Sequence, residues 1–172
     1  SVVASKGSLT IVISNPRVRV GLIGAGAIGR VYAQALSASR EAELAAVADV
    51  SLDAAAAVAE PAGVPAFGDA ERLWRQVDVD AVVIGASVDI ESALALASSM
   101  RVNRPSMGVV LVRRRVDTSV LADALRSGVR EVVEERDLPG INAAVARVKS
   151  LASSLRETVP GASSPDDSGE HG

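Results

Sequence analysis

Short runs rich in Val and Ile alternate along the chain with Ala- and Leu-rich stretches that have helical spacing. Such alternation is typical of βαβ units, whose helices cover both faces of a parallel sheet. The predicted strands are Val18–Ile23, Glu43–Ala48, Val64–Phe67, Ala81–Ile84, Gly108–Val112 and Val129–Val133. Ala81–Ile84 is apolar throughout, as a central strand buried on both faces must be. We therefore predict an α/β fold with three layers and a doubly wound, mostly parallel sheet of five or six strands.

Polar residues, glycine and proline mark the ends of the predicted helices. Ser51, Asp69 and Asp117 precede helical stretches and can cap them through side-chain oxygens. Gly128 suits the C-terminal cap of the helix that Asp117 begins. We expect the helix after Ser51 to stop at Pro61, because proline cannot extend a helix and restricts the residue before it.

A chain of 172 residues is long enough for one sizeable core and too short for two full domains. We predict a single domain over residues 17–158, a preceding extension of residues 1–16 with one strand-like run at Leu9–Ile13, and a disordered tail or linker at 159–172. The last helix has an apolar stripe over Ile141–Leu155, which can pack on the sheet or bind a partner. The chain begins at Ser1 rather than Met, as expected of a processed protein or a fragment.

Composition excludes several functions. The net charge of −3 gives no general attraction to nucleic acid or to anionic membranes, and no apolar run is long enough to span a bilayer. There is no Cys, and the only His is His171 in the polar tail, so we expect neither a metal site nor a catalytic Ser/His/Asp set. These features favour a cytoplasmic protein without nucleic-acid or membrane partners.

A glycine-rich segment joins the first strand directly to the first helix, with the spacing G-x-G-x-x-G. Its residues are Gly24, Ala25, Gly26, Ala27, Ile28 and Gly29. The first glycine permits the tight turn, the second lets backbone approach a pyrophosphate, and the third permits close packing of helix and strand. Free N–H groups at the helix start then attract the anion. The segment predicts a dinucleotide site in a Rossmann/flavodoxin-like domain.

Asp49 ends the second predicted strand, 23 positions after Gly26. A carboxylate there can accept hydrogen bonds from both ribose hydroxyls and would repel a 2′-phosphate, which favours NAD over NADP. Gly85 and Ala86 end the central strand at the same crevice, and we include them among the cofactor-binding residues. The alternative is that the glycines only shape a turn and Asp49 only caps or solvates a loop.

Two further features of the same sheet edge have both a functional and a structural interpretation. Ser87 and Asp89 lie where the central strand ends, which is where doubly wound folds bind ligands, and a helix cap explains them equally well. Arg113–Arg115 follow the next strand and can hold phosphates or form a solvated loop.

Residues 18–86 resemble the N-terminal half of the Gfo/Idh/MocA oxidoreductases, on the segments VRVGLIGAGAIGRVYAQAL, AELAAVADVSLDAAAAVAE, GVPAFGDAERLW and VDAVVIGAS, the last of which runs on to Ser87. The resemblance implies an NAD-binding Rossmann half with the glycine segment at the pyrophosphate and Asp49 at the adenosine ribose. The Glu-Lys-Pro segment that bears the family's catalytic lysine is absent, since the only lysines are Lys6 and Lys149. The large substrate domain is absent too, and we expect no competent enzyme from this chain alone.

Residues 82–156 resemble the receiver-like N-terminal domain of TadZ/CpaE-type pilus-assembly ATPases, on the segment VDIESALALASSMRVNRPSMGVVLVRRRVDTSVLADALRSGVREVVEERDL. The positions that carry phosphorelay chemistry in receivers lack the required residues: Gly85–Ser87 replace the phosphoacceptor and Glu134 or Glu135 the lysine. The alternative function is therefore a non-enzymatic pseudo-receiver that localises or regulates a MinD/ParA-like ATPase through protein contacts. A homodimer or ATPase partner would then use the helix Ile141–Leu155.

Overall fold

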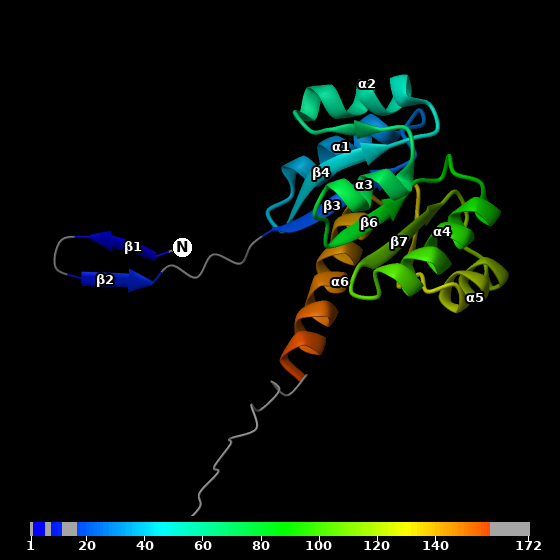
Figure 1. The fold of residues 1–172 in the computed structure, drawn as a ribbon. Helices are drawn as coiled ribbons and strands as arrows, with labels where there is room; N and C mark the ends of the chain where they lie inside the picture. The colour runs from blue at the N-terminus through cyan, green and yellow to red at the C-terminus, as the bar shows by residue number, and fades with distance from the viewer. Residues whose placement is uncertain (1, 6–7, 12–16, 159–172) are drawn as a thin grey trace, which may run out of the picture.

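A computed structural model describes residues 2–5, 8–11 and 17–158, and the side chains of residues 17–148. Its main sheet has six strands in the order β5-β4-β3-β6-β7-β8, all paired in parallel (Figure 1). The strands are β3 (Val18–Ile23), β4 (Ala42–Ala48), β5 (Ala66–Phe67), β6 (Ala81–Ile84), β7 (Gly108–Arg113) and β8 (Glu131–Glu134). The predicted α/β class and strand number are confirmed. In order along the chain the strands stand 3-2-1-4-5-6, the order of Rossmann domains.

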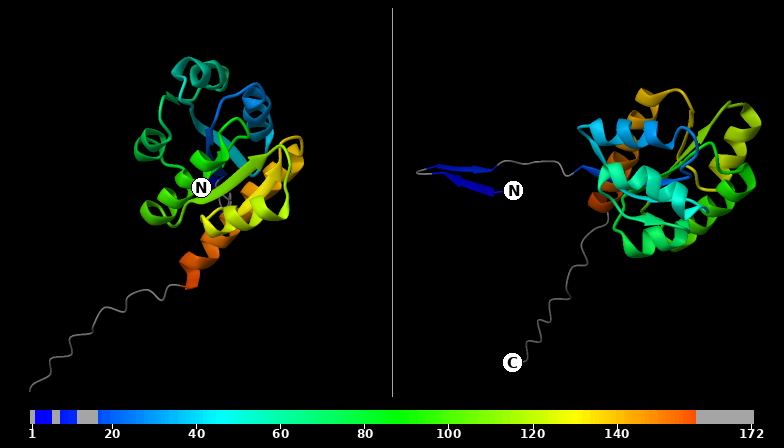
Figure 2. Two further views of the ribbon diagram at one scale, coloured as in Figure 1. Left: turned by 90° about the vertical axis from the view of Figure 1, so that its right-hand side faces the viewer. Right: turned by 90° about the horizontal axis from the view of Figure 1, so that it is seen from above.

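Helices cover both faces of this sheet (Figures 1 and 2). The helices are α1 (Gly29–Ala38), α2 (Leu52–Ala62), α3 (Ala70–Gln76), α4 (Ile90–Asn103), α5 (Thr118–Arg126) and α6 (Leu138–Thr158). Buried side chains of α1, α2 and α6 share one core with the sheet, and those of α3, α4 and α5 share another. The layers are therefore helix, sheet and helix, as predicted.

The central strand and the last helix account for much of the core. All side chains of β6 are fully buried. Ile141, Ala144, Val145 and Val148 of α6 are buried against the sheet, so this part of the predicted stripe is core. Gly108 starts β7 directly beneath α6, and a Cβ there would overlap the Val148 side chain. The helix can lie on the strand only because residue 108 has no side chain.

Helix ends follow the predicted caps with one correction. Ser51, Asp69, Asp89 and Asp117 each accept hydrogen bonds from backbone N–H groups in the first turn of their helices. The prediction that α2 stops at Pro61 was wrong, because proline occupies the last turn and the helix continues to Ala62. It ends where Gly63 adopts φ +68° and donates to the carbonyls of the last turn.

Outside this domain the structure describes an antiparallel pair, β1 (Val2–Ser5) and β2 (Ser8–Ile11). The sequence predicted one strand here, Leu9–Ile13, of which residues 12 and 13 lie outside the described part. The predicted tail, 159–172, lies outside it as well. Among the described residues no helix is both long and apolar enough to cross a membrane.

Candidate functional site

The glycine turn joins the end of β3 to the start of α1. Gly24 has φ +93°, a conformation that a side chain disfavours. A Cβ on Gly24 would lie 2.9 Å from Val88 Cγ2, and one on Gly26 would lie 2.7 Å from Ser87 Cβ. Gly24 and Gly26 must therefore lack side chains, because Ser87 and Val88 in the loop after β6 occupy the space that a Cβ would need.

Gly29 has a different environment from the one that the motif predicts. A Cβ there would meet Val58 Cγ2 of α2 at 3.4 Å, which is ordinary van der Waals contact, rather than the strand. The expectation that this glycine allows close packing of helix and strand is therefore wrong for this chain. Alanine would fit in its place.

The turn presents unused donors. Within residues 17–158, the backbone N–H groups of Gly26, Ala27 and Ile28 donate no hydrogen bond, and no side chain caps α1. Because Ile28 is the N-cap residue, these groups stand at the positive end of the helix dipole. This is the arrangement that binds phosphate in dinucleotide folds.

Asp49 connects the turn to the next helix. Its Oδ2 accepts a hydrogen bond from the N–H of Ala25 at 2.7 Å, and its Oδ1 accepts one from the N–H of Ser51 at 2.8 Å. Its own N–H donates to the carbonyl of Phe67 in β5 at 3.0 Å. The carboxylate is therefore held in one orientation beside the glycine turn, while each oxygen keeps a lone pair for a further donor.

A cavity of about 570 Å³ opens beside Asp49 and extends between α3 and α4. That volume lies within the range typical of small-molecule sites. Its lining includes Gly24, Asp49 and Ser87 near the turn and Trp74 deeper between the helices. Val50, at its rim, is 99% exposed, although it is an aliphatic residue. The cavity therefore offers both apolar surface and carboxylate oxygens.

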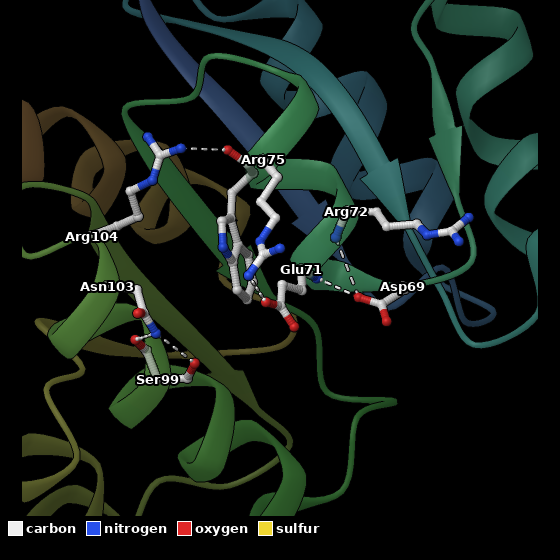
Figure 3. A network of polar contacts seen from close by, with 8 residues as sticks. Asp69, Glu71, Arg72, Arg75, Ser99, Asn103 and Arg104 are labelled. Carbon is white, nitrogen blue, oxygen red and sulfur yellow. Dashed lines mark hydrogen bonds and ion pairs between the residues drawn. The ribbon is translucent and has the colours of Figure 1, made fainter.

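The charges around this cavity have one sign. Asp49, Asp69, Glu71 and Asp89 line it, and among the described residues no lysine or arginine does. Figure 3 shows the α3 side, where Asp69 accepts hydrogen bonds from the N–H groups of Glu71 and Arg72, and Glu71 pairs with Arg75 at 2.6 Å. In the described part of the chain, no group of three or more His, Cys, Asp or Glu side chains could hold a metal ion.

The loop after β6 forms the wall opposite Asp49 and is anchored at two points. The guanidinium of Arg113, at the end of β7, donates to the carbonyl of Val88 at 2.8 Å. Asp89 caps α4 by accepting from the N–H of Ser92, and hydrogen bonds from the Ser92 backbone and side chain, with the nearby Arg113 charge, lower the pKa of Asp89. The helix-cap interpretation of Asp89 is confirmed, and because Asp89 also lines the cavity, ligand binding by its carboxylate stays a prediction.

Gly24 and Asp49 are the predicted cofactor-binding residues that line the cavity. The predicted Ala25, Gly26, Ala27, Ile28, Gly29, Gly85 and Ala86 form the turn or the adjoining loop and do not line it. Sequence reasoning missed Val50, Gly68, Asp69 and Trp74 as lining residues. Gly68 and Asp69 directly follow β5, at the carboxyl end of the strands where the cavity lies, and this position could have identified them from the sequence.

Comparison with known proteins agrees with this geometry. Residues 18–99 match the Gfo/Idh/MocA model, described as an oxidoreductase family with an NAD-binding Rossmann fold. This segment is thus similar to the NAD-binding domain of the Gfo/Idh/MocA oxidoreductases. The inositol 2-dehydrogenase of Rhizobium meliloti (strain 1021) is 42% identical over 77 residues, which make up 45% of this chain and 23% of that enzyme.

Two solved structures share the fold. A myo-inositol dehydrogenase from Corynebacterium glutamicum has a TM-score of 0.55 and 24% identity, over 78% of this chain and 42% of that one. An oxidoreductase from Agrobacterium radiobacter, in complex with NAD+, L-tartaric acid and magnesium, has a TM-score of 0.55 and 18% identity, over 68% of this chain and 35% of that one. The chain spans less than half the length of each of these relatives.

The comparisons support the first of the two sequence resemblances and not the second. The family match continues through residue 99, past residue 86 where the first resemblance stops, and enters the segment likened to pilus-assembly ATPases. The NAD cofactor named by the matched family model is the one predicted from Asp49. The pseudo-receiver resemblance of residues 82–156 receives no support.

Proposed function

We propose that this protein is an NAD-binding module. The pyrophosphate would bind at the N-terminus of α1, where the N–H groups of Gly26, Ala27 and Ile28 are unused. The adenosine ribose would lie against Asp49, and the adenine would enter the cavity past Val50. The observation that carries the proposal is the Asp49 carboxylate, which the glycine turn itself holds at the mouth of the cavity.

The charges favour NAD over NADP. A ribose 2′-phosphate would approach Asp49 in a cavity whose other charged groups are also carboxylates. Like charges that approach without an intervening cation repel, and a site selective for NADP normally supplies an arginine. The pyrophosphate avoids this repulsion because it binds the helix terminus outside the acidic cavity.

We also propose that this chain binds the cofactor without catalysing hydride transfer. Removing hydride from an alcohol requires a base to accept the hydroxyl proton, most often a His, a Lys or a carboxylate. Among the described residues neither His nor Lys lines the cavity, and its carboxylates surround the proposed adenosine end. A polyol such as myo-inositol should therefore not be oxidised by the chain alone.

Isothermal titration calorimetry with NAD+ and NADP+ tests the proposal. We expect NAD+ to bind and NADP+ to bind at least about tenfold more weakly, a difference of about 1.4 kcal/mol. Asp49→Asn keeps the size of the side chain but removes its charge, so it should weaken the binding of NAD+ and reduce the difference between the NAD+ and NADP+ affinities. Asp123→Asn removes an exposed carboxylate of α5 that does not line the cavity, and it should change neither affinity.

Two outcomes would contradict the proposal. If neither dinucleotide releases heat at millimolar concentration, the module does not bind this cofactor. If NADP+ binds as tightly as NAD+ to the unmodified protein, Asp49 does not face the ribose. Turnover of NAD+ with myo-inositol, followed by absorbance of NADH, would overturn only the non-catalytic part.

A further inference from the structure

A second hollow, of about 350 Å³, lies at the opposite edge of the sheet from the cavity described above. It is bounded by the end of α4, the loop into β7 and the start of β8. Its lining residues are Arg101, Pro105, Met107, Val109, Gly128 and Arg130. We refer to these six residues as the arginine hollow. Two of them are cationic and, among the described residues, none is acidic.

Backbone carbonyls hold the arginines in place. Arg101 donates from Nη1 to the carbonyl of Arg126 at 3.2 Å, and Arg130 donates from Nη2 to the carbonyl of Pro105 at 3.4 Å. The stem of Arg101 also packs over Gly128, where a Cβ would lie 2.9 Å from its Cδ. Each guanidinium has five N–H donors and uses one here, so most of its donors remain available.

The positive charge of the hollow is uncompensated. Among the side chains that the structure describes, neither Arg101 nor Arg130 lies within ion-pair distance of a carboxylate. Arg104 does not line the hollow, because its guanidinium donates to the carbonyl of Trp74 in the last turn of α3 (Figure 3). By contrast, Arg126 nearby is paired with Asp123 at 2.9 Å.

A purely structural role does not account for this charge. Arg101 donates to the last carbonyl of α5 and itself stands in the last turn of α4, so it can offset two helix dipoles. A helix C-terminus amounts to about −0.5 of an elementary charge, and two of them to about −1. Arg101 and Arg130 together supply two positive charges, so about one remains.

We propose that the arginine hollow binds an oxyanion, specifically the phosphate group of a small organic phosphate. Guanidinium groups bind phosphate oxygens in pairs of parallel hydrogen bonds, and carbonyl-held guanidiniums lose little freedom on doing so. The floor of the hollow is apolar, since Met107 is 7% and Val109 2% exposed, and Pro105 adds to the wall. This surface suits the organic part of a phosphate monoester.

The site is independent of the proposed dinucleotide site. Strand β7 runs from Gly108, beside the hollow, to Arg113, which holds the loop at the dinucleotide cavity. The two sites share no lining residue. Phosphate binding at the hollow should therefore persist even if NAD+ does not bind.

The test is a titration of the full chain with inorganic phosphate and with phenyl phosphate at constant ionic strength, followed by ¹H–¹⁵N NMR. We expect saturable shifts of the Met107 and Gly128 amide signals, with phenyl phosphate binding more tightly because its ring covers the apolar floor. Arg101→Gln and Arg130→Gln should each weaken binding about tenfold, as loss of one charge-assisted interaction predicts. Arg40→Gln, which removes one exposed positive charge elsewhere, should leave it unchanged.

Equal affinity for the two probes would still support an oxyanion site, with free phosphate as the ligand. Shifts that equal those of a chloride titration, or the same loss of binding in Arg40→Gln as in Arg101→Gln, would overturn the proposal. NAD+ affinity of Arg101→Gln and Arg130→Gln, measured in parallel, should equal that of the unmodified protein. Loss of NAD+ binding together with folded-state NMR signals would show that the two sites are not separate.

Discussion

Gly26→Ala tests how tightly the glycine turn is packed against the loop after β6. The added Cβ would lie 2.7 Å from Ser87 Cβ and 2.9 Å from Ser87 Oγ. Carbon atoms in contact prefer separations of about 3.5–4.0 Å, so the two segments must move apart by about 1 Å. Ser87 Cβ cannot rotate away, and its loop is held by Arg113 and by the Asp89 cap. The crowding must therefore be relieved by backbone movement.

Overpacking of this kind costs about 1–3 kcal/mol. Thermal unfolding followed by circular dichroism should show a Tm lowered by about 2–12 °C for a domain of this size. Ser87→Gly removes the opposing atoms at a cost of up to about 1 kcal/mol from the added freedom of the unfolded chain. The Gly26→Ala/Ser87→Gly protein should be at least about 1 kcal/mol more stable than the sum of the single changes predicts.

Gly29→Ala is the matched control within the same motif. Its Cβ would have ordinary contacts, and alanine favours a helix over glycine by up to about 1 kcal/mol, so stability should be unchanged or slightly higher. NAD+ affinity should fall in Gly26→Ala, since Ser87 and Val88 line the cavity and move together. The reasoning is refuted if Gly26→Ala unfolds at the temperature of the unmodified protein, or if Ser87→Gly does not offset its effect.

Three other changes have defined outcomes. Gly108→Ala should destabilise the protein by about 3 kcal/mol in urea unfolding, because its Cβ overlaps Val148, and Val148→Ala should relieve part of that loss. Arg113→Gln should weaken NAD+ binding in calorimetry by releasing the Val88 carbonyl, and Arg113→Lys should restore part of the affinity. Burial, aided by the Glu135 charge, raises the pKa of Tyr32 to about 12. The phenol therefore loses its proton at a lower pH in the unfolded chain than in the folded one, so stability should be unaffected below pH 10 and fall between about pH 10 and 12. Tyr32→Phe should remove that dependence. Absorbance at 295 nm reports the ionisation of this single tyrosine.

Sequence periodicity and capping residues were sufficient for the fold, because they act locally. The apolar run Ala81–Ile84 predicted the central strand, and Ser51, Asp69 and Asp117 predicted helix starts, since a cap depends on residues within one turn. Pro61 was misjudged because the end of α2 is decided by Gly63, which can take the left-handed conformation two residues later. Proline was tolerated in the last turn of α2, and the left-handed glycine after it ended the helix.

The candidate site was predicted only in part, because distant segments build it. Gly24 and Asp49 were recognisable from a spacing, whereas Trp74 enters the cavity from α3, a helix that the motif does not include. The role of Gly29 depends on Val58 of α2, a contact that spacing along the chain does not specify. Residues whose function depends on tertiary neighbours require the coordinates.

The second half of the chain completes the site as well as the core. Strand β6 is fully buried only because β7 pairs with it along Ala81–Ile84, and β7 lies beyond residue 99, where the family match ends. From the end of β7, Arg113 reaches back to the carbonyl of Val88 and so fixes the wall opposite Asp49. The matched segment alone would lack the Arg113 anchor of this wall, and its strand β6 would keep β3 as a neighbour but lose β7. Strand β7 must therefore be in place for the wall opposite Asp49 to be anchored.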